Sequence, residues 1–303
     1  MLLAIGIVAG LFFPSLSGAI QPHALAALFL VVVFSLVPFA RIPSSTLFGL
    51  EVGTLRIVAW QQVVLPAIVV AAGVLARFSD GLILLLVVTT CSGSLFASPA
   101  LAQFLQLDRQ RALQCMLLST MVMPISLYAF LSLLRGADVQ LNLVEYAHRS
   151  FIFLVCPILL FAAYRLAINR VPEAMARKVE GGSRWATVVA LIFFGVGMMN
   201  PVAMQLKTMP DQVVLYLGLT VLLSVVMFVL TRIVLHRYGN IEASTGAVLG
   251  SFRNVGLGFA LVSSMTGPEL DVYVGVSMLP IFIGPFIMQV MLSESFARRA
   301  QMA

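Results

Sequence analysis

The chain has 303 residues, of which 61% are hydrophobic and only 10% are charged. A soluble protein carries about 25% charged residues, so this composition excludes an ordinary water-soluble fold and favours the lipid bilayer as the surrounding solvent. The net charge of +6 is not gathered into a basic arm or patch, which argues against nucleic acid as a partner. The three cysteines all lie in apolar segments and are interpreted as small buried side chains, not as disulfides or metal ligands.

A helix needs about 20 apolar residues to cross a bilayer. In chain order, the sequence predicts ten such segments, near residues 2–20, 24–40, 57–76, 81–105, 112–134, 150–168, 185–206, 212–236, 243–265 and 272–293. The first is the weakest because Pro14 interrupts it. The basic stretch 169–184 is expected to be a loop, and Asn200-Pro201 is expected to form a turn at the end of the seventh segment.

The basic residues between these segments indicate an orientation. With ten spans, thirteen arginines and lysines fall on the side that holds both termini and four fall on the other side. Because cytoplasmic loops carry the excess of basic residues, both termini are expected in the cytoplasm, here of a bacterial plasma membrane.

Ten spans divide into residues 1–149 and residues 150–303, with five spans each. An odd number of spans inverts the second half relative to the first, which is the repeat pattern of many secondary transporters. Two pairs of residues share one offset: Ser98 and Asn254 are 156 residues apart, and so are Pro124 and Pro280. We therefore expect two inverted five-helix repeats.

The fourth and ninth segments contain residues that interrupt helices. Pro99 lacks a backbone donor and restrains the residue before it, and Gly256 belongs to a glycine-rich stretch. Backbone groups freed by a break need partners inside protein or along a wet cavity, so matching breaks in two halves indicate a binding site, although small residues also serve close helix packing. The residues expected to bind substrate at these breaks are Ser94, Ser98, Asn254 and Gly256.

Arg253 is the one charged residue deep inside a predicted span, since all twelve acidic residues lie in or beside loops. A charge at that depth costs about 2.5–3.5 kcal/mol on insertion scales and normally faces a polar path or a ligand. Two interpretations stay open. Arg253 either offers its donors to an anionic substrate, or it bonds free carbonyl groups at the helix breaks and never meets the substrate.

Several stretches, in span order over nearly the whole chain, resemble the bile acid:sodium symporter family. Gln61, five residues before Pro66, resembles a pattern of the family's third span, and residues 90–99 resemble its fourth span. Arg253-Asn254-Val255-Gly256-Leu257 resembles the Gln-Asn-x-Gly-Leu core of the ninth. The resemblance implies a ten-helix fold in which a panel of spans 1, 2, 6 and 7 moves against a core of spans 3–5 and 8–10, where the broken spans 4 and 9 cross.

The sequence departs from this family at the sodium sites. The family's Glu on the ninth span falls on Leu249, and its Gln falls on Arg253. The residues that mark the former ion-site region are Gln61, Ser119 and Thr120. A guanidinium and a sodium ion 4 Å apart repel each other by roughly 4 kcal/mol at an effective dielectric of 20. We therefore expect Arg253 to replace at least one sodium ion, with no metal site and no cofactor.

The sequence thus predicts an all-α polytopic membrane protein, a secondary carrier for a small organic anion that works by alternating access. No intramembrane His or carboxylate is present to activate a nucleophile, and no nucleotide-binding loop is recognisable, so an enzyme or an ATP-driven pump is not expected. Two alternatives stay open: a sodium-coupled organic anion symporter, and a non-transporting membrane receptor or structural protein. The oligomeric state is left open.

Overall fold

The computed structural model describes residues 2–134, 142–168 and 170–300, and most of them are helical. Within these ranges β-structure is limited to one isolated antiparallel bridge, between Ser94 and Arg253. The fold class is therefore all-α, as the composition predicted.

The helices of the first 134 residues are α1 (Leu2–Phe12), α2 (Pro14–Ile20), α3 (Ala24–Leu36), α4 (Ser44–Phe48), α5 (Val52–Ala59), α6 (Leu65–Leu75), α7 (Asp80–Cys91), α8 (Ser98–Phe104) and α9 (Arg109–Leu133). The later helices are α10 (Leu143–Ser150), α11 (Cys156–Ile168), α12 (Glu173–Thr208), α13 (Pro210–Leu235), α14 (Asn240–Ser251), α15 (Val255–Val262) and α16 (Pro268–Ala300). Short 3-10 helices are η1 (Gln21–His23), η2 (Val37–Phe39) and η5 (His236–Tyr238), whereas η3 (Trp60–Val64) and η4 (Phe151–Val155) are π-helical.

Six helical stretches of the described chain are long and apolar enough to cross a membrane: Pro14–Phe39, Val52–Leu75, Arg109–Leu133, Leu143–Ile168, Glu173–Thr208 and Pro210–Tyr238. Such stretches are typical of an integral membrane protein. α7 is also apolar but has only 12 residues, because the helix breaks after Cys91.

The prediction that residues 169–184 form a loop is wrong from Glu173 onward, where α12 begins behind Pro172. This stretch is basic but consists largely of good helix formers, and Glu173 pairs with Arg177 one turn later at 3.6 Å. Charge alone therefore misplaced the start of the helix.

The expected turn at Asn200-Pro201 is also wrong, because α12 continues through Pro201 to Thr208. A proline inside a membrane helix is tolerated where neighbouring groups satisfy the backbone that it frees. At 1.5 Å per residue, the 36 residues of α12 extend about 54 Å, well beyond a hydrocarbon core of about 30 Å.

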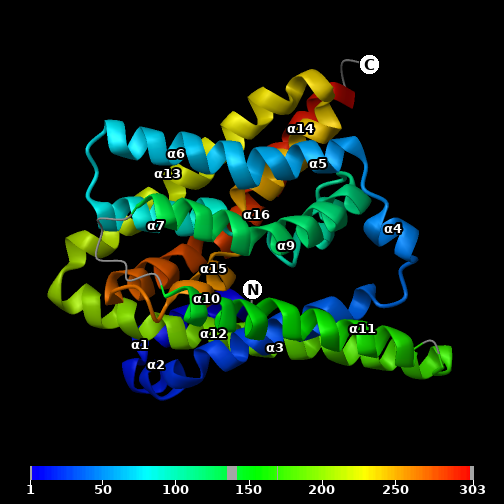
Figure 1. Cartoon of the computed structure of the whole chain (residues 1–303), viewed down its shortest axis with the longest axis horizontal. Coiled ribbons are helices and arrows are strands. Elements are labelled where there is room, and N and C mark those ends of the chain that lie inside the picture. Colours follow the sequence, from blue (N-terminus) through cyan, green and yellow to red (C-terminus); the bar gives the residue numbers. More distant parts are fainter. Residues whose placement is uncertain (1, 135–141, 169, 301–303) are drawn as a thin grey trace.

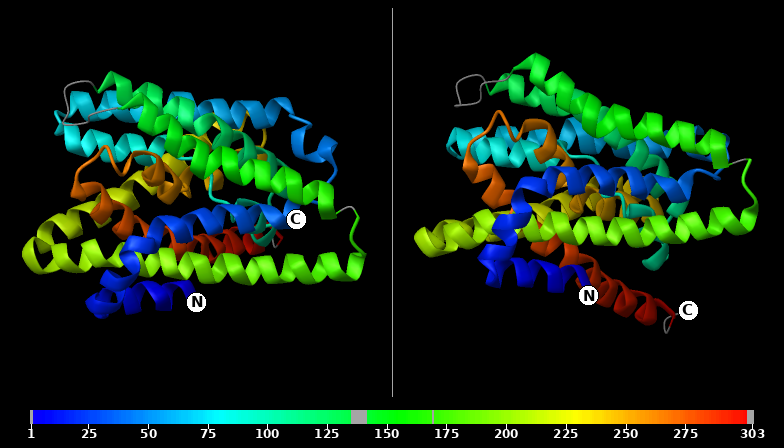
Figure 2. Two further views of the ribbon diagram at one scale, coloured as in Figure 1. Left: turned by 60° about the horizontal axis from the view of Figure 1, so that its bottom comes forward. Right: turned by 90° about the horizontal axis from the view of Figure 1, so that it is seen from below.

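The helices form two groups. In the first, called the α12 group, α1, α2 and α3 contact α12, and α11 contacts α3. Figure 2 shows α1 lying along the long yellow-green ribbon of α12. In the second, called the α7 group, α6 contacts α7, α5 and α7 contact α9, and α13 contacts α14 and α16. Figure 1 shows α3, α11 and α12 along one side of the molecule and α5, α6 and α7 along the other.

Glycines allow the two groups to approach closely. A Cβ atom on Gly275 of α16 would lie 2.3 Å from the carbonyl oxygen of Met198 in α12, and one on Gly256 would lie 2.9 Å from the ring of Phe194. An added Cβ atom would displace the backbone of α12 at Gly275 and the ring of Phe194 at Gly256, so both positions favour glycine for packing.

Candidate functional site

Two helix breaks meet inside the α7 group. Residues 92–97 separate α7 from α8, and residues 252–254 separate α14 from α15. Both breaks fall in the segments where the sequence predicted them. Because α7 contacts α15 and α8 contacts α14, the four half-helices cross one another at the breaks.

Backbone hydrogen bonds join the two breaks directly. The Asn254 N–H donates to the carbonyl oxygen of Gly93 at 2.8 Å, and the Leu95 N–H donates to that of Phe252 at 3.2 Å. Pairing of this kind satisfies polar backbone groups that no bilayer lipid can satisfy. We call residues 92–97 and 252–254 together the crossover.

Arg253 lies within the crossover, and only 1% of it is exposed. Its Nη2 donates to the carbonyl oxygen of Gln61 at 2.6 Å and also to that of Thr90, and its Nη1 donates to Gln61 Oε1 at 3.2 Å. Its Nε has no hydrogen-bond partner among the residues described. No described carboxylate lies within salt-bridge distance of the guanidinium. Arg253 is thus a buried cation held by neutral oxygens.

The free carbonyl of Gln61 has a cause in the sequence. In the π-helical segment η3, the Leu65 N–H bonds the carbonyl five residues earlier, that of Trp60. The next donor in this series would come from Pro66, which has no N–H. The Gln61 carbonyl is therefore left without its helical partner, and Arg253 takes that place.

The carbonyl of Thr90 is free for a similar reason. α7 ends at Cys91, so Ser94, whose N–H would continue the helix, bonds the Ser119 hydroxyl at 3.0 Å instead. Arg253 thereby bonds the end of one broken helix and the bulge of another helix. This geometry is that of the second interpretation of Arg253, in which it bonds free carbonyls at breaks.

Of the residues of the predicted former ion site, Gln61 bonds Arg253 directly and Ser119 bonds Ser94 of the crossover. Gln61 Oε1 accepts a bond from the Ser94 hydroxyl at 3.4 Å, and Gln61 Nε2 donates to the Gly246 carbonyl at 3.0 Å. The Ser119 hydroxyl donates to the Met116 carbonyl at 3.2 Å. Thr120 Oγ1 is buried and has no partner within the described chain. No group of His, Cys, Asp or Glu able to hold a metal ion occurs in the same part of the chain.

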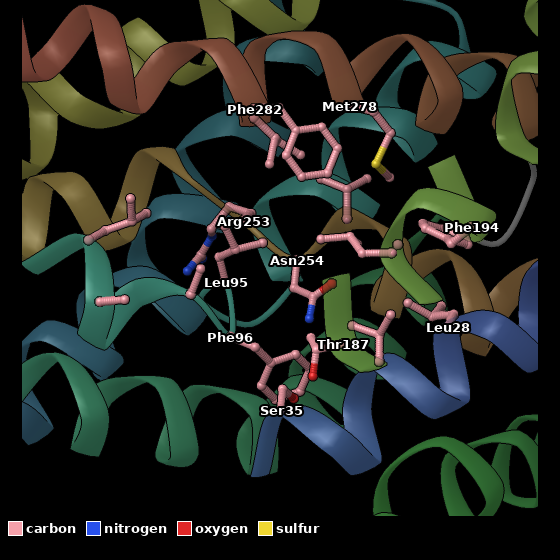
Figure 3. Close-up of a pocket in the computed structure, with 18 of the residues that line it drawn as sticks. Leu28, Ser35, Leu95, Phe96, Thr187, Phe194, Arg253, Asn254, Met278 and Phe282 are labelled. Atoms are coloured by element: carbon pink, nitrogen blue, oxygen red, sulfur yellow. The ribbon is translucent and has the colours of Figure 1, made fainter. Parts of the chain in front are cut away.

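A cavity of about 510 Å³ lies between the crossover and the α12 group. Its walls come from α3, α8, α12, α15, α16 and the residues of the crossover, and Figure 3 shows most of the residues that line it. Most are apolar; the polar exceptions are Ser35, Thr187, Arg253 and Asn254. A largely apolar pocket with a few polar groups is the usual form of a site for a small organic molecule.

Asn254 presents an amide to this cavity. Its Oδ1 accepts the Leu257 N–H at 3.3 Å and so caps the start of α15. The other polar atom of the amide, Nδ2, is not used by this cap and can donate to another group. This nitrogen makes no hydrogen bond to a described residue, and in Figure 3 it points toward Thr187. The guanidinium of Arg253 points away from Asn254 in the same view. Asn254 is therefore the donor most directly available to a bound molecule.

Of the five residues predicted to bind substrate, Arg253, Asn254 and Gly256 line the cavity. Ser94 and Ser98 do not line it, and both are buried within the crossover region. Sequence reasoning missed Ser35 and Thr187, which belong to long apolar helices and carry no local signal. Their hydroxyls donate to their own helices, at 2.9 Å to Val32 and 2.8 Å to Ser183, so only their oxygens remain for a ligand.

No protein-family model matches this chain, and no curated protein sequence matches it.

Proposed function

We propose that the chain is a secondary carrier that moves a small organic anion across the membrane by alternating access, in the manner of the bile acid:sodium symporters that its motifs resemble. The observation that carries this proposal is the cavity of about 510 Å³ between the α12 group and the crossover. Discontinuous helices that meet at a ligand cavity are typical of transporter binding sites.

The proposed architecture has ten membrane segments in two inverted repeats, residues 1–149 and 150–303. Each half supplies one broken helix to the crossover, which supports such a relation. The bias of thirteen basic residues against four supports cytoplasmic termini. In this arrangement the α12 group is the panel, and it moves against the α7 group as the cavity opens alternately to either side.

The charge of Arg253 supports an anionic substrate. No described carboxylate neutralises it, and an uncompensated cation in a region of low dielectric attracts anions over several ångströms. In this proposal Asn254 donates a hydrogen bond to the substrate directly. Arg253 stabilises the crossover through its hydrogen bonds, and its positive charge attracts the anion. By the resemblance, Arg253 stands at the Gln position of the family's sodium sites, so in this proposal it replaces at least one sodium ion and the full family sodium sites are not used.

The proposal is tested with the full chain in proteoliposomes. Radiolabelled organic anions, beginning with cholate as an amphipathic carboxylate, are offered in sodium buffer and in potassium buffer. We expect saturable uptake that is equal in the two buffers and absent from empty liposomes. Uptake that strictly depends on sodium would overturn the proposal that Arg253 replaces a sodium ion.

A non-transporting receptor is distinguished by labelling. A Thr187→Cys variant places a thiol in the cavity wall, while Cys91 and Cys115 are fully buried and Cys156 is replaced by Ala. A carrier shows both protection of this thiol by the anion and uptake of the anion. Protection without any uptake would identify a receptor and would overturn the transport proposal.

A further inference from the structure

A second cavity, of about 480 Å³, lies between α3, α11 and α12. It uses other faces of α3 and α12 than the first cavity does, and α11 closes its third side. Most of its wall is apolar, with Phe34 and Phe161 among the contributing residues. None of the residues that line it belongs to the crossover, so the site proposed for the anion does not explain it.

Gly182 leaves part of this space open. It lines the cavity, and a Cβ atom added to it would meet no atom within 4 Å. Its neighbour Gly181 is equally unhindered but is not part of the cavity wall. A side chain added at Gly182 would therefore enter the cavity, whereas the same side chain added at Gly181 would not.

The end of the cavity nearest the basic helix termini is polar. The hydroxyl of Tyr164 is buried there without a hydrogen-bond partner in the described chain. Arg165, the next residue of α11, does not line the cavity; it donates one bond to the Ser44 hydroxyl at 2.9 Å, and its other terminal nitrogen, Nη1, is buried without a described partner. Buried donors without partners are costly and indicate a ligand oxygen that would accept from them.

The surroundings of this polar end are basic. The chain segments that adjoin this end, residue 41 and residues 165–184, carry six basic residues, Arg41 and the five between positions 165 and 184, against two acids, Glu173 and Glu180. Basic pockets between membrane helices at the cytoplasmic side typically bind the headgroups of anionic lipids. An apolar interior joined to a basic, donor-rich end matches a molecule with a hydrocarbon chain and an anionic head.

We propose that this cavity binds one anionic phospholipid of the surrounding membrane, with an acyl chain beside Gly182 and the phosphate near the Tyr164 hydroxyl. The inference is independent of the transport proposal, because it requires only that the helices lie in a membrane. It has a consequence for the first cavity: Ser183 lines the lipid site, and its carbonyl accepts a bond from the Thr187 hydroxyl, which lines the anion cavity, at 2.8 Å. The lipid therefore packs against the same helices that wall the anion cavity.

Native mass spectrometry of the delipidated full chain in detergent tests the proposal, with phosphatidylglycerol and phosphatidylcholine as the two probes. We expect one tightly retained phosphatidylglycerol per chain, at concentrations at least tenfold lower than phosphatidylcholine needs. Gly182→Leu fills the space and should abolish this binding, whereas Gly181→Leu, which adds the same side chain outside the cavity, should retain it.

Tyr164→Phe removes one oxygen without filling the cavity and should weaken retention of phosphatidylglycerol several-fold, because the lipid phosphate loses a donor. This variant also decides the matter if Gly182→Leu does not fold. The proposal is overturned if Gly182→Leu and Tyr164→Phe both bind phosphatidylglycerol as the unmodified chain does. Equal retention of the two lipids would overturn the proposed preference for an anionic headgroup.

Discussion

Arg253 donates hydrogen bonds to both the backbone carbonyl and the side-chain oxygen of Gln61, a residue 192 positions earlier in the chain. The same guanidinium bonds the carbonyl of Thr90 at the end of α7. One side chain thereby joins three discontinuities: the π-helical bulge η3, the break after α7 and the break before α15. Its loss should loosen all three.

Arg253→Met should lower the free energy of unfolding by about 2–6 kcal/mol, because two buried carbonyls lose their donors at roughly 1–3 kcal/mol each. Arg253→Gln should cost less, since an amide can still donate to one of those carbonyls. The measurement is the thermal unfolding midpoint in detergent, which should fall in the order unmodified, Gln variant, Met variant. A Met variant as stable as the unmodified chain would show that these bonds do not stabilise the crossover.

The role of Pro66 gives a second prediction, concerning the coupling between two residues. Pro66→Ala restores an N–H that can reach the Gln61 carbonyl, so Arg253 is no longer that carbonyl's only donor. Arg253→Met should then destabilise the Pro66→Ala variant less than it destabilises the unmodified chain, by about 1 kcal/mol or more in a double-mutant cycle. Unfolding midpoints of the four chains measure this coupling.

Pro157 provides the matched control for that cycle. It follows the other π-helical segment, η4, whose bulge is not bonded by Arg253. Pro157→Ala and Arg253→Met should therefore have additive effects. Equal coupling of Arg253 to both prolines would mean that the cycle reports general loosening of the helices and not the bond to Gln61.

The breaks were predictable because their causes are local. Pro99 and the glycines around Gly256 disfavour a helix at their own positions, whatever the rest of the chain does. The partners of Arg253 were not predictable, since Gln61 and Thr90 are brought to it by packing between distant helices. Pro66 indicates a disturbed helix but does not distinguish a π-helical bulge from an ordinary kink.

The cavity shows the same limit. Arg253, Asn254 and Gly256 stood out because polar and small residues are unusual in the middle of an apolar span, and all three line the cavity. Ser35 and Thr187 resemble ordinary helical hydroxyls, and only the contact of α3 and α12 with the crossover places them there. Sequence patterns thus identified the wall that is locally irregular and missed the wall that is built from regular helices.

Asn254→Asp should separate binding from stability. An aspartate keeps the oxygen that caps α15, so the unfolding midpoint should change little. It replaces the Nδ2 donor with a second oxygen and places a negative charge in the cavity, so the affinity for an organic anion should fall about tenfold to a hundredfold. Protection of Thr187→Cys from labelling measures that affinity. If the anion protects the Thr187→Cys thiol equally well in the Asn254→Asp variant, Asn254 does not bind the substrate.

Gly275→Ala should loosen the contact between the two helix groups. The added Cβ atom would lie 2.3 Å from the Met198 carbonyl oxygen and 2.6 Å from a methyl carbon of Val202, so α12 must move away from α16. We expect an unfolding midpoint lower by several degrees, consistent with an overpacking cost of about 1–3 kcal/mol. The matched control is Gly218→Ala in α13, where a Cβ atom meets nothing within 4 Å and alanine favours the helix by about 0.5–1 kcal/mol. If both variants unfold at the same temperature, close packing at Gly275 does not hold α12 against α16.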